Sequence, residues 1–271
     1  MKSSKELSID ITLIDLIETF SLSENVMKGL KLLLANEEIQ ATQEYANTVS
    51  IVRLGFNDHG PVHMRKVTST GALMMDLLRK AGIKTTLETD GCGTFEDSLL
   101  GVMMAAMLHD IGMVMGRQNH ESHSTILAYP IITDVLKQVF NDDIKRIVMI
   151  RGIALEGIAG HMGTLKVSSL EAGIVQVADG CDMTKGRARI PIALSHSGKM
   201  GQIHQYSANS IEEVLISAGC EKPIRIDVNM SSEVGLFQVE EVLMHKIALS
   251  TAKQHIELYA KVCDNEVKRY L

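Results

Sequence analysis

His109 and Asp110 are adjacent in this chain, and they are the residues best suited to chemistry. They end an apolar run that begins at Leu99, and a run this apolar is expected to form a buried helix. Two ionisable side chains at the end of a buried element cost free energy unless something pairs with them. An imidazole nitrogen beside a carboxylate oxygen offers two ligands to one divalent ion. His109 and Asp110 are therefore the first candidates for a metal site.

Further histidines and a carboxylate occur where predicted helices would present them. His59 and His63 lie four apart at the entry to a predicted helix, so a helical first turn would place them on one face. Asp179 lies on the apolar stripe of another predicted helix, where a carboxylate needs a cation, a hydrogen-bond cage or a proton. Metal ligation and a hydrogen-bond cage are equally open for it, and Asp182 is a competing or supporting carboxylate. Helix ends supply three more histidines, each of which taken alone is more typical of a surface residue: His120, His123 and His161.

The order of these residues resembles the HD superfamily of metal-dependent phosphohydrolases. In that family a helical bundle supplies a histidine, a His-Asp doublet and a distal aspartate to a divalent ion. His63 with Val67 looks like the first motif, and the run from His109 to Gly112 looks like the second. Ala178-Asp179, with Asp182, looks like the last, so the resemblance covers about residues 55–190. The wider chain resembles a group of uncharacterised prokaryotic HD proteins, which supplies no substrate.

Members with two metal ions, such as the HD-GYP proteins and the cyclic nucleotide phosphodiesterases, carry two further histidines between the doublet and the last aspartate. His120 (or His123) and His161 occupy that interval here. The phosphodiesterases also place a general-acid histidine four residues before their first metal histidine, as His59 stands to His63. The Gly-Tyr-Pro element of HD-GYP proteins is absent after His161, which argues against cyclic di-GMP as the substrate. The resemblance thus implies six metal ligands: His63, His109, Asp110, His120, His161 and Asp179.

The implied activity is hydrolysis of a phosphoester, either a monoester or a diester, in a nucleotide or a related small phosphorylated molecule. One or two divalent ions (Mn, Fe, Mg or Ni) would lower the pKa of the attacking water, with Asp110 shared between the ions. His59 would donate a proton to the leaving oxygen. Two alternatives stay open: a regulatory protein that binds a nucleotide or metal without turnover, and a di-iron HD-type oxygenase. Four basic residues could either bind the substrate phosphate or simply be solvated at a helix end: Arg117, Lys185, Arg187 and Arg189.

Apolar periodicity predicts a mostly α protein, with an HD-type helical bundle followed by a small α+β module. Strict alternation predicts strands at 224–230 and 255–262, with a helix at 234–250 between them and Val214–Ile216 as a hairpin partner, in ββαβ order. We expect a helical domain over residues 1–208, including N-terminal helices within residues 1–50, and the module over residues 209–271. Helices are predicted at 13–20, 26–34, 64–81, 97–109, 122–139 (kinked or broken at Pro130), 142–159 and 168–183 (capped by a box from Ser168 to Glu171), with loops at 84–97 and 190–206.

Composition limits the classes of function. The chain has 271 residues, 45% of them hydrophobic, which is ample for one main domain and a small appendage. Its net charge of −6 argues against nucleic acid as a partner. No segment approaches the ~20 uninterrupted apolar residues of a membrane span, and no signal peptide is evident, so we expect a cytoplasmic protein that does not bind membranes. The four widely spaced cysteines are expected to be reduced. An exposed strand edge in the module predicts a homodimer.

Overall fold

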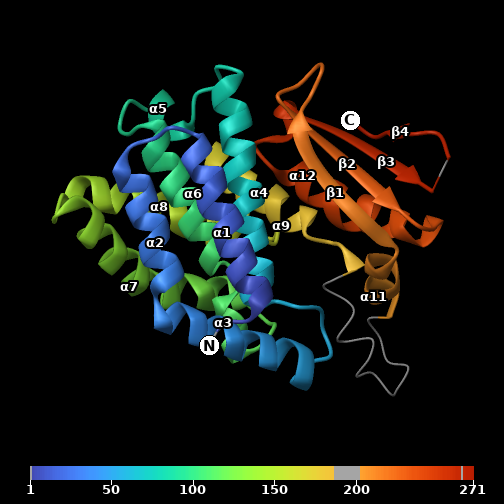
Figure 1. Ribbon diagram of the computed structural model, residues 1–271, viewed down its shortest axis with the longest axis horizontal. Coiled ribbons are helices and arrows are strands. Elements are labelled where there is room, and N and C mark those ends of the chain that lie inside the picture. Colours follow the sequence, from blue (N-terminus) through green and yellow to red (C-terminus); the bar gives the residue numbers. More distant parts are fainter. Residues whose placement is uncertain (1, 186–201, 264) are drawn as a thin grey trace.

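The structure, a computed structural model, describes residues 2–185, 202–263 and 265–271. It confirms the predicted class: a mostly helical body followed by a small sheet at the C-terminal end (Figure 1). The α-helices are α1 (Ser4–Thr19), α2 (Glu24–Ala35), α3 (Glu37–Thr48), α4 (Pro61–Lys80), α5 (Thr86–Thr89), α6 (Phe95–Leu108), α7 (His120–Phe140), α8 (Ile144–Gly160), α9 (Leu170–Cys181), α11 (Gln202–Asn209) and α12 (Met244–Leu249). Shorter 3-10 or π-helical segments are η1 (Val49–Arg53), η2 (Ile111–Met115), η3 (Glu233–Gly235), η4 (Gln238–Leu243) and η5 (Lys253–His255).

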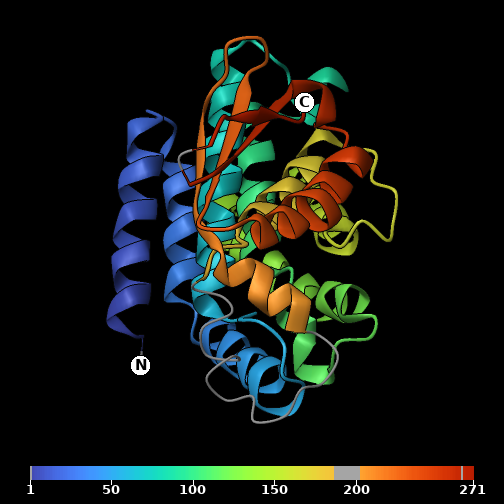
Figure 2. The ribbon, with the colours of Figure 1, turned by 90° about the vertical axis from the view of Figure 1, so that its right-hand side faces the viewer.

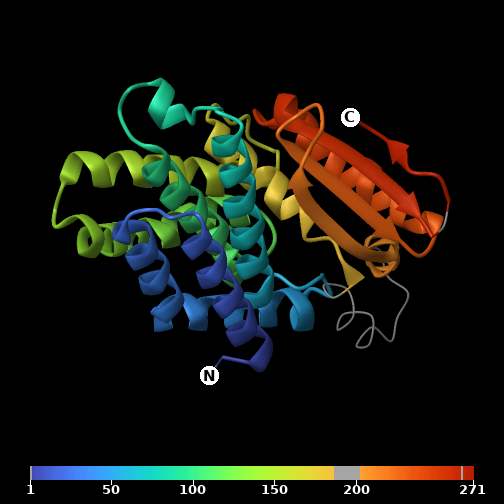
Figure 3. The same ribbon diagram turned by 45° about the horizontal axis from the view of Figure 1, so that its top comes forward.

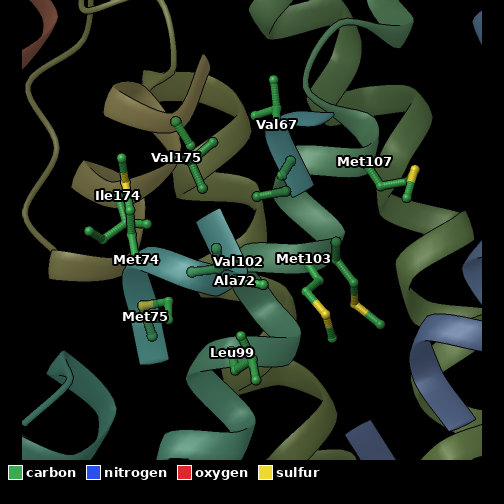
Figure 4. Close-up of a cluster of buried hydrophobic side chains, with 14 of the residues drawn as sticks. Val67, Ala72, Met74, Met75, Leu99, Val102, Met103, Met107, Ile174 and Val175 are labelled. Atoms are coloured by element: carbon green, nitrogen blue, oxygen red, sulfur yellow. The ribbon is translucent and has the colours of Figure 1, made fainter. Parts of the chain in front are cut away.

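Helix α6 lies at the centre of the helical body, between α4, α8 and α9. All of its residues except Glu96 are buried, as its apolar sequence predicts. Figure 4 shows Leu99 and Val102 of α6 in one hydrophobic cluster with Met74 of α4 and Val175 of α9. The unbranched methionine side chains fill irregular gaps between these helices. The helix that ends directly before the His-Asp doublet is therefore fixed by packing on several sides.

One segment of the described chain, Phe95–Met115, is long and apolar enough to cross a membrane by length and composition. Its most apolar window is 89% buried inside the protein. Burial of that extent is the pattern of a core helix, because a spanning helix would present much of this surface to lipid. The segment's apolar character thus serves the core around the doublet.

Several predicted element ends are wrong, for identifiable reasons. Ser169, and not Ser168, caps α9: its hydroxyl accepts from the backbone N–H of Ala172 at 3.1 Å. The carboxylate of Glu171 makes no capping box, because it accepts from the N–H of Leu87 at the start of α5, inside the predicted loop. Helix α7 continues through Pro130, which removes only one intrahelical hydrogen bond. Helices α3 and α11 were also missed, and the helix predicted over 234–250 is divided among η3, η4 and α12.

The C-terminal sheet has strand order β1-β2-β3-β4. Strand β1 pairs with β2 and β3 with β4 antiparallel, whereas β2 and β3 are parallel and are connected through η4 and α12. Figures 2 and 3 show this connecting helical segment between the sheet and α9. Strict alternation of β2 is confirmed, with every second side chain buried. The strands are β1 (Ile211–Ala218), β2 (Ile224–Met230), β3 (Ile256–Val262) and β4 (Lys268–Arg269), of which β4 was not predicted.

The sheet and the helical body share one continuous hydrophobic core. Ile226 of β2, Leu243 of η4 and Val177 of α9 all belong to it. The division into two domains at residue 208 therefore stays a prediction. The homodimer also stays a prediction. Strand β1 lies at an edge of the sheet, and most of its residues are exposed or half-buried.

Candidate metal centre

Five helix ends bring the predicted ligands together. His63 lies in the first turn of α4, where Pro61 fits the first helical position because its missing N–H would be unpaired there anyway. His109 directly follows α6, and Asp110 comes next, before η2. All six side chains are buried, none more than 7% exposed. The remaining three come from the start of α7, the end of α8 and the end of α9: His120, His161 and Asp179.

Asp110 lies between two pairs of histidines. Its Oδ2 is 3.4 Å from Nε2 of His63 and 3.2 Å from Nε2 of His109. Its Oδ1 is 3.2 Å from Nε2 of His120 and 3.4 Å from Nε2 of His161. The two oxygens of one carboxylate thus face two neighbouring groups of imidazoles. This is the arrangement expected of a carboxylate shared between two ions.

Asp179 adds a second carboxylate to the cluster. Its Oδ1 lies 3.2 Å from Nε2 of His63 and 3.7 Å from Nε2 of His109. Three overlapping sets of side chains have candidate ligand atoms within 4.8 Å of one another. These sets are His63–His109–Asp110, His109–His161–Asp179 and Asp110–His120–His161.

The acceptors beside the Nδ1 atoms of the four histidines indicate that their Nε2 atoms can bind a cation. Nδ1 of His109 lies 2.8 Å from the carbonyl of Ala106, and Nδ1 of His161 lies 2.7 Å from the carbonyl of Ile158. A carbonyl only accepts, so the N–H must be on Nδ1, and Nε2 of a neutral ring then carries a bare lone pair. His120 and His63 follow the same rule: their Nδ1 atoms face the carbonyl of Arg117 at 3.0 Å and the carboxylate of Asp182 at 2.8 Å.

The bare nitrogens face each other. Nε2 of His63 and of His109 are 3.1 Å apart, and so are Nε2 of His120 and of His161. Facing lone pairs beside two carboxylates repel unless positive charge lies among them. Divalent ions would supply that charge, and imidazole and carboxylate ligands suit Mn, Fe, Mg or Ni. The donor set therefore fits the metal centre that the resemblance implies.

Burial and charge set the protonation of the cluster. Burial lowers the pKa of His161 to about 4, so the ring is neutral at pH 7 and its Nε2 is available as a ligand. Burial alone would raise the pKa of Asp110, but the neighbouring His109 and other imidazoles hold it well below its usual range. For Asp179 burial acts in the same way, and Lys246 is the main cause that lowers its pKa well below the usual range. Both carboxylates are therefore ionised.

Gly112 sets the distance between the doublet and His120. A Cβ atom at this position would lie 2.1 Å from the carbonyl oxygen of His120 and 2.5 Å from the backbone nitrogen of Ser124. Its N–H instead donates to the hydroxyl of Ser124 at 2.8 Å. Only glycine permits this approach. The start of α7, which carries His120, is thereby held against the turn that follows Asp110.

Outer partners orient the ligands. Asp182, which accepts from His63, also accepts from the ammonium of Lys66 at 3.0 Å. The carboxylate of Glu121 lies 3.1 Å from Nδ1 of His120. Acceptors on the far nitrogen of a ligating histidine fix its ring and raise its basicity. Asp182 therefore has the supporting position that the sequence left open for it, whereas Lys66 and Glu121 were not predicted.

His59 and Arg117 lie beside the cluster, in a pocket of about 280 Å³ that Asp110 and Asp179 also line. The Nη1 atom of Arg117 is 3.5 Å from Nε2 of His59 and equally far from Nε2 of His120. Nδ1 of His59 lies 2.6 Å from the carbonyl of Asn57, so it carries the hydrogen. The structure thus brings two of the predicted substrate and proton-transfer residues to one face of the cluster.

The other candidates lie elsewhere. His123 is three residues beyond His120 and is not among the clustered ligand atoms. Lys185 is exposed, forms an ion pair with Glu212 of β1 and is not among the residues that line the pocket. Arg187 and Arg189 lie outside the residues that the structure describes.

Sequence reasoning missed Lys246, whose ammonium forms an ion pair with Oδ2 of Asp179. A signal was present. Val239, Leu243 and Ile247 form a buried stripe with helical spacing, and Lys246 is three residues after Leu243, on the same side of a helix. A lysine on a buried face needs an acid, as an aspartate there needs a base.

Comparison with known proteins agrees with the geometry. A family model for the HD domain matches residues 63–184, which include all six clustered side chains. The uncharacterized protein MJ1020 of Methanocaldococcus jannaschii is 40% identical over 230 residues, which is 85% of this chain and 86% of that protein. No solved structure gives a significant match. The HD-domain match covers the helix ends that carry the buried His-Asp cluster, so this chain belongs to the HD superfamily.

Proposed function

We propose that this protein hydrolyses a phosphoester bond in a nucleotide or a related small phosphorylated molecule, using two divalent ions. The proposal rests mainly on the carboxylate of Asp110. One of its oxygens faces His63 and His109, and the other faces His120 and His161. When bound, such ions lower the pKa of a water molecule and offset charge on the phosphoryl oxygens. The chain's own task is to hold, orient and protonate the substrate beside them.

The pocket offers a place for the phosphoryl group. Arg117 has no carboxylate partner among the described residues; its guanidinium contacts two imidazoles and the sulfur of Met162. A partly buried guanidinium without an acid is well suited to bind an anion, and its planar N–H groups match phosphate oxygens. We therefore propose that Arg117 binds the phosphoryl group. The pocket volume of about 280 Å³ suits a small molecule.

We assign proton transfer to His59. Since Nδ1 donates to Asn57, Nε2 is the nitrogen that gains and releases a proton in the pocket. A phosphoryl group between His59 and Arg117 would compensate the charge of both. Nε2 would then donate to the leaving oxygen. Ser50, whose hydroxyl lies 2.8 Å from Nδ1, supports the ring from behind.

The test is metal analysis of the purified protein together with a panel of phosphomonoesters and phosphodiesters that includes nucleotides. We expect about two ions per chain and hydrolysis of at least one ester. His59→Asn is expected to keep its metal and to lower kcat by about 10²- to 10⁴-fold, the usual contribution of general acid–base catalysis. Loss of metal in His59→Asn would make this residue a ligand instead.

The same experiment separates the rival functions. A wild-type protein that binds metal and nucleotide but hydrolyses no ester would be a regulatory binding protein. Two irons per chain with substrate-dependent oxygen consumption would identify a di-iron oxygenase, because hydrolysis consumes no oxygen.

A further inference from the structure

The C-terminal part of the chain forms one wall of the pocket. Gln238, Val242 and Lys246 line it from η4 and α12, and His59 and Arg117 line it from the helical body. These residues lie beyond residue 184, where the match to the HD domain ends. The pocket is therefore built from two parts of the chain, and only one of them carries the family's motif.

Lys246 is the charged group that this wall contributes. It is 7% exposed, and Asp179 is its ion-pair partner. The two oxygens of Asp179 have different neighbours: Oδ1 faces the histidines, whereas Oδ2 faces Lys246. The ammonium therefore pairs with the carboxylate oxygen that does not face the histidines, and Lys246 and Asp179 both line the pocket. An ammonium has three N–H donors, so a single carboxylate oxygen does not exhaust it.

The surrounding packing holds this lysine in place. Gly180, next to Asp179, leaves room for its stem: a Cβ atom there would lie 3.2 Å from Cδ of Lys246 and 3.1 Å from Cδ1 of Leu243. Just after α12, the hydroxyl of Ser250 donates to the carbonyl of Gly173 in α9 at 2.8 Å. These contacts fix α12 against α9, so the position of the ammonium follows from the packing of two helices.

We propose that Lys246 is a substrate-binding residue that bridges Asp179 and a phosphoryl oxygen of the substrate. Arg117, which lines the same pocket from the helical body, binds the same group. The substrate is therefore an anion held across the junction of the two parts, and the C-terminal part completes the active site. This inference rests on the proposed function, since it assigns the pocket to a phosphorylated ligand.

The test uses the full chain, loaded with metal, and inorganic phosphate as the probe. Phosphate affinity is measured by calorimetry and metal content by elemental analysis, for the wild type, Lys246→Met and Lys246→Arg. We expect Lys246→Met to keep its metal and to bind phosphate about 10- to 100-fold more weakly, the usual effect of losing one charge-assisted hydrogen bond. Lys246→Arg should recover much of that loss. In turnover assays KM should rise more than kcat falls.

Lys253→Met is the matched control, because Lys253 belongs to the same part of the chain but is exposed and does not line the pocket. It should bind phosphate as the wild type does. Should Lys246→Met fail to fold, Lys246→Gln carries the same expectation, since it keeps an N–H donor for Asp179 without the charge.

Three results would overturn the proposal. These are unchanged phosphate affinity in Lys246→Met, a loss of metal that accounts for the weaker phosphate binding, and no phosphate binding by the wild type. The second would mean that Lys246 acts only by holding Asp179. Failure of the proposed function looks different: the metal-loaded wild type would hydrolyse no ester, while the phosphate titration would still report on Lys246.

Discussion

The His-Asp cluster of the helical body and the ion pairs on the C-terminal sheet differ in how deeply they are buried. In the helical body, two aspartates and four histidines meet in the core. On the sheet, pairs such as Arg225 with Asp227 lie near the surface, where solvent screens them. Buried charge costs several kcal/mol per ion when it is not compensated, so a buried cluster of ligands is weak evidence for stability. This contrast indicates that the buried cluster in the helical body serves a chemical function rather than stability. Lys246 connects the C-terminal part to that cluster through its ion pair with Asp179.

Removing the shared carboxylate should have the largest effect. Asp110→Ala takes away the group that faces both pairs of histidines, so we expect metal affinity to fall by more than about 100-fold, beyond the usual effect of changing an outer partner. Hydrolysis should disappear with the metal. Elemental analysis and metal titration measure the change. Asp227→Ala, on the sheet surface, should leave metal content as it is; retained metal in Asp110→Ala would refute the ligand assignment.

The two halves of the cluster can be separated by a pair of neighbouring histidines. His120→Ala removes one ligand of the group around Oδ1 of Asp110, so we expect the number of bound ions to fall from about two to about one per chain. His123→Ala, one turn further along α7, should keep both ions. Metal stoichiometry measured side by side decides between the two residues. An equal loss in both variants would mean that the change disturbs the start of α7 instead.

Sequence alone could predict the parts of this site that helix ends carry. His63, His109, Asp110, His120, His161 and Asp179 each lie at or near an end of a predicted helix, and the family's order links them. The sequence could not predict that the two oxygens of Asp110 face two different pairs of histidines, because side-chain directions are set by packing. The close backbone contacts of Gly112 with the start of α7 could not be predicted either, because they depend on how segments pack against one another.

For the C-terminal part, the sequence predicted the fold better than the contribution to the site. Its strands could be predicted, because β2 alternates strictly and lies half-buried on the sheet. Its contribution to the site could not: the apolar stripe beside Lys246 places this lysine on a buried face, but only the packing of α12 against α9 identifies Asp179 as its partner. The short strand β4 was missed as well, because two residues carry no periodicity. Sequence patterns within one helix or strand thus predicted that element, whereas contacts between elements could not be predicted from the sequence.

Acid should distinguish the two regions without any mutation in the site. In the metal-free protein burial lowers the pKa of His161 from 6.5 to about 4. The unfolded chain therefore binds the proton more readily between these values, and the free energy of unfolding falls as the pH drops from about 6.5 toward 4. The loss attributable to His161 is on the order of 3 kcal/mol. Urea unfolding of chelator-treated protein at pH 7.5, 6.0 and 4.5 measures it.

A matched pair of variants assigns that pH dependence. His161→Gln should flatten the slope. His255→Gln, directly before β3, should change the slope much less, because burial lowers the pKa of His255 but the side chain is only half-buried. Equal slopes in the wild type and His161→Gln would show that another group dominates the acid response.

The smallest effect is expected where the two regions are joined. Ser250→Ala removes the hydroxyl that donates to the carbonyl of Gly173 at 2.8 Å and accepts from the N–H of Ala252 at 3.0 Å. We expect the free energy of unfolding to fall by about 1 kcal/mol, the net contribution of a typical hydrogen bond, as measured by urea unfolding. Thr125→Ala, which loses an exposed hydrogen bond within α7, should change it far less. If the stability falls and KM for the substrate rises while metal content is constant, the docking of α12 on α9 sets the position of Lys246. A lower stability with unchanged KM would instead mean that Leu243 and Ile247 hold the helix in place without this contact.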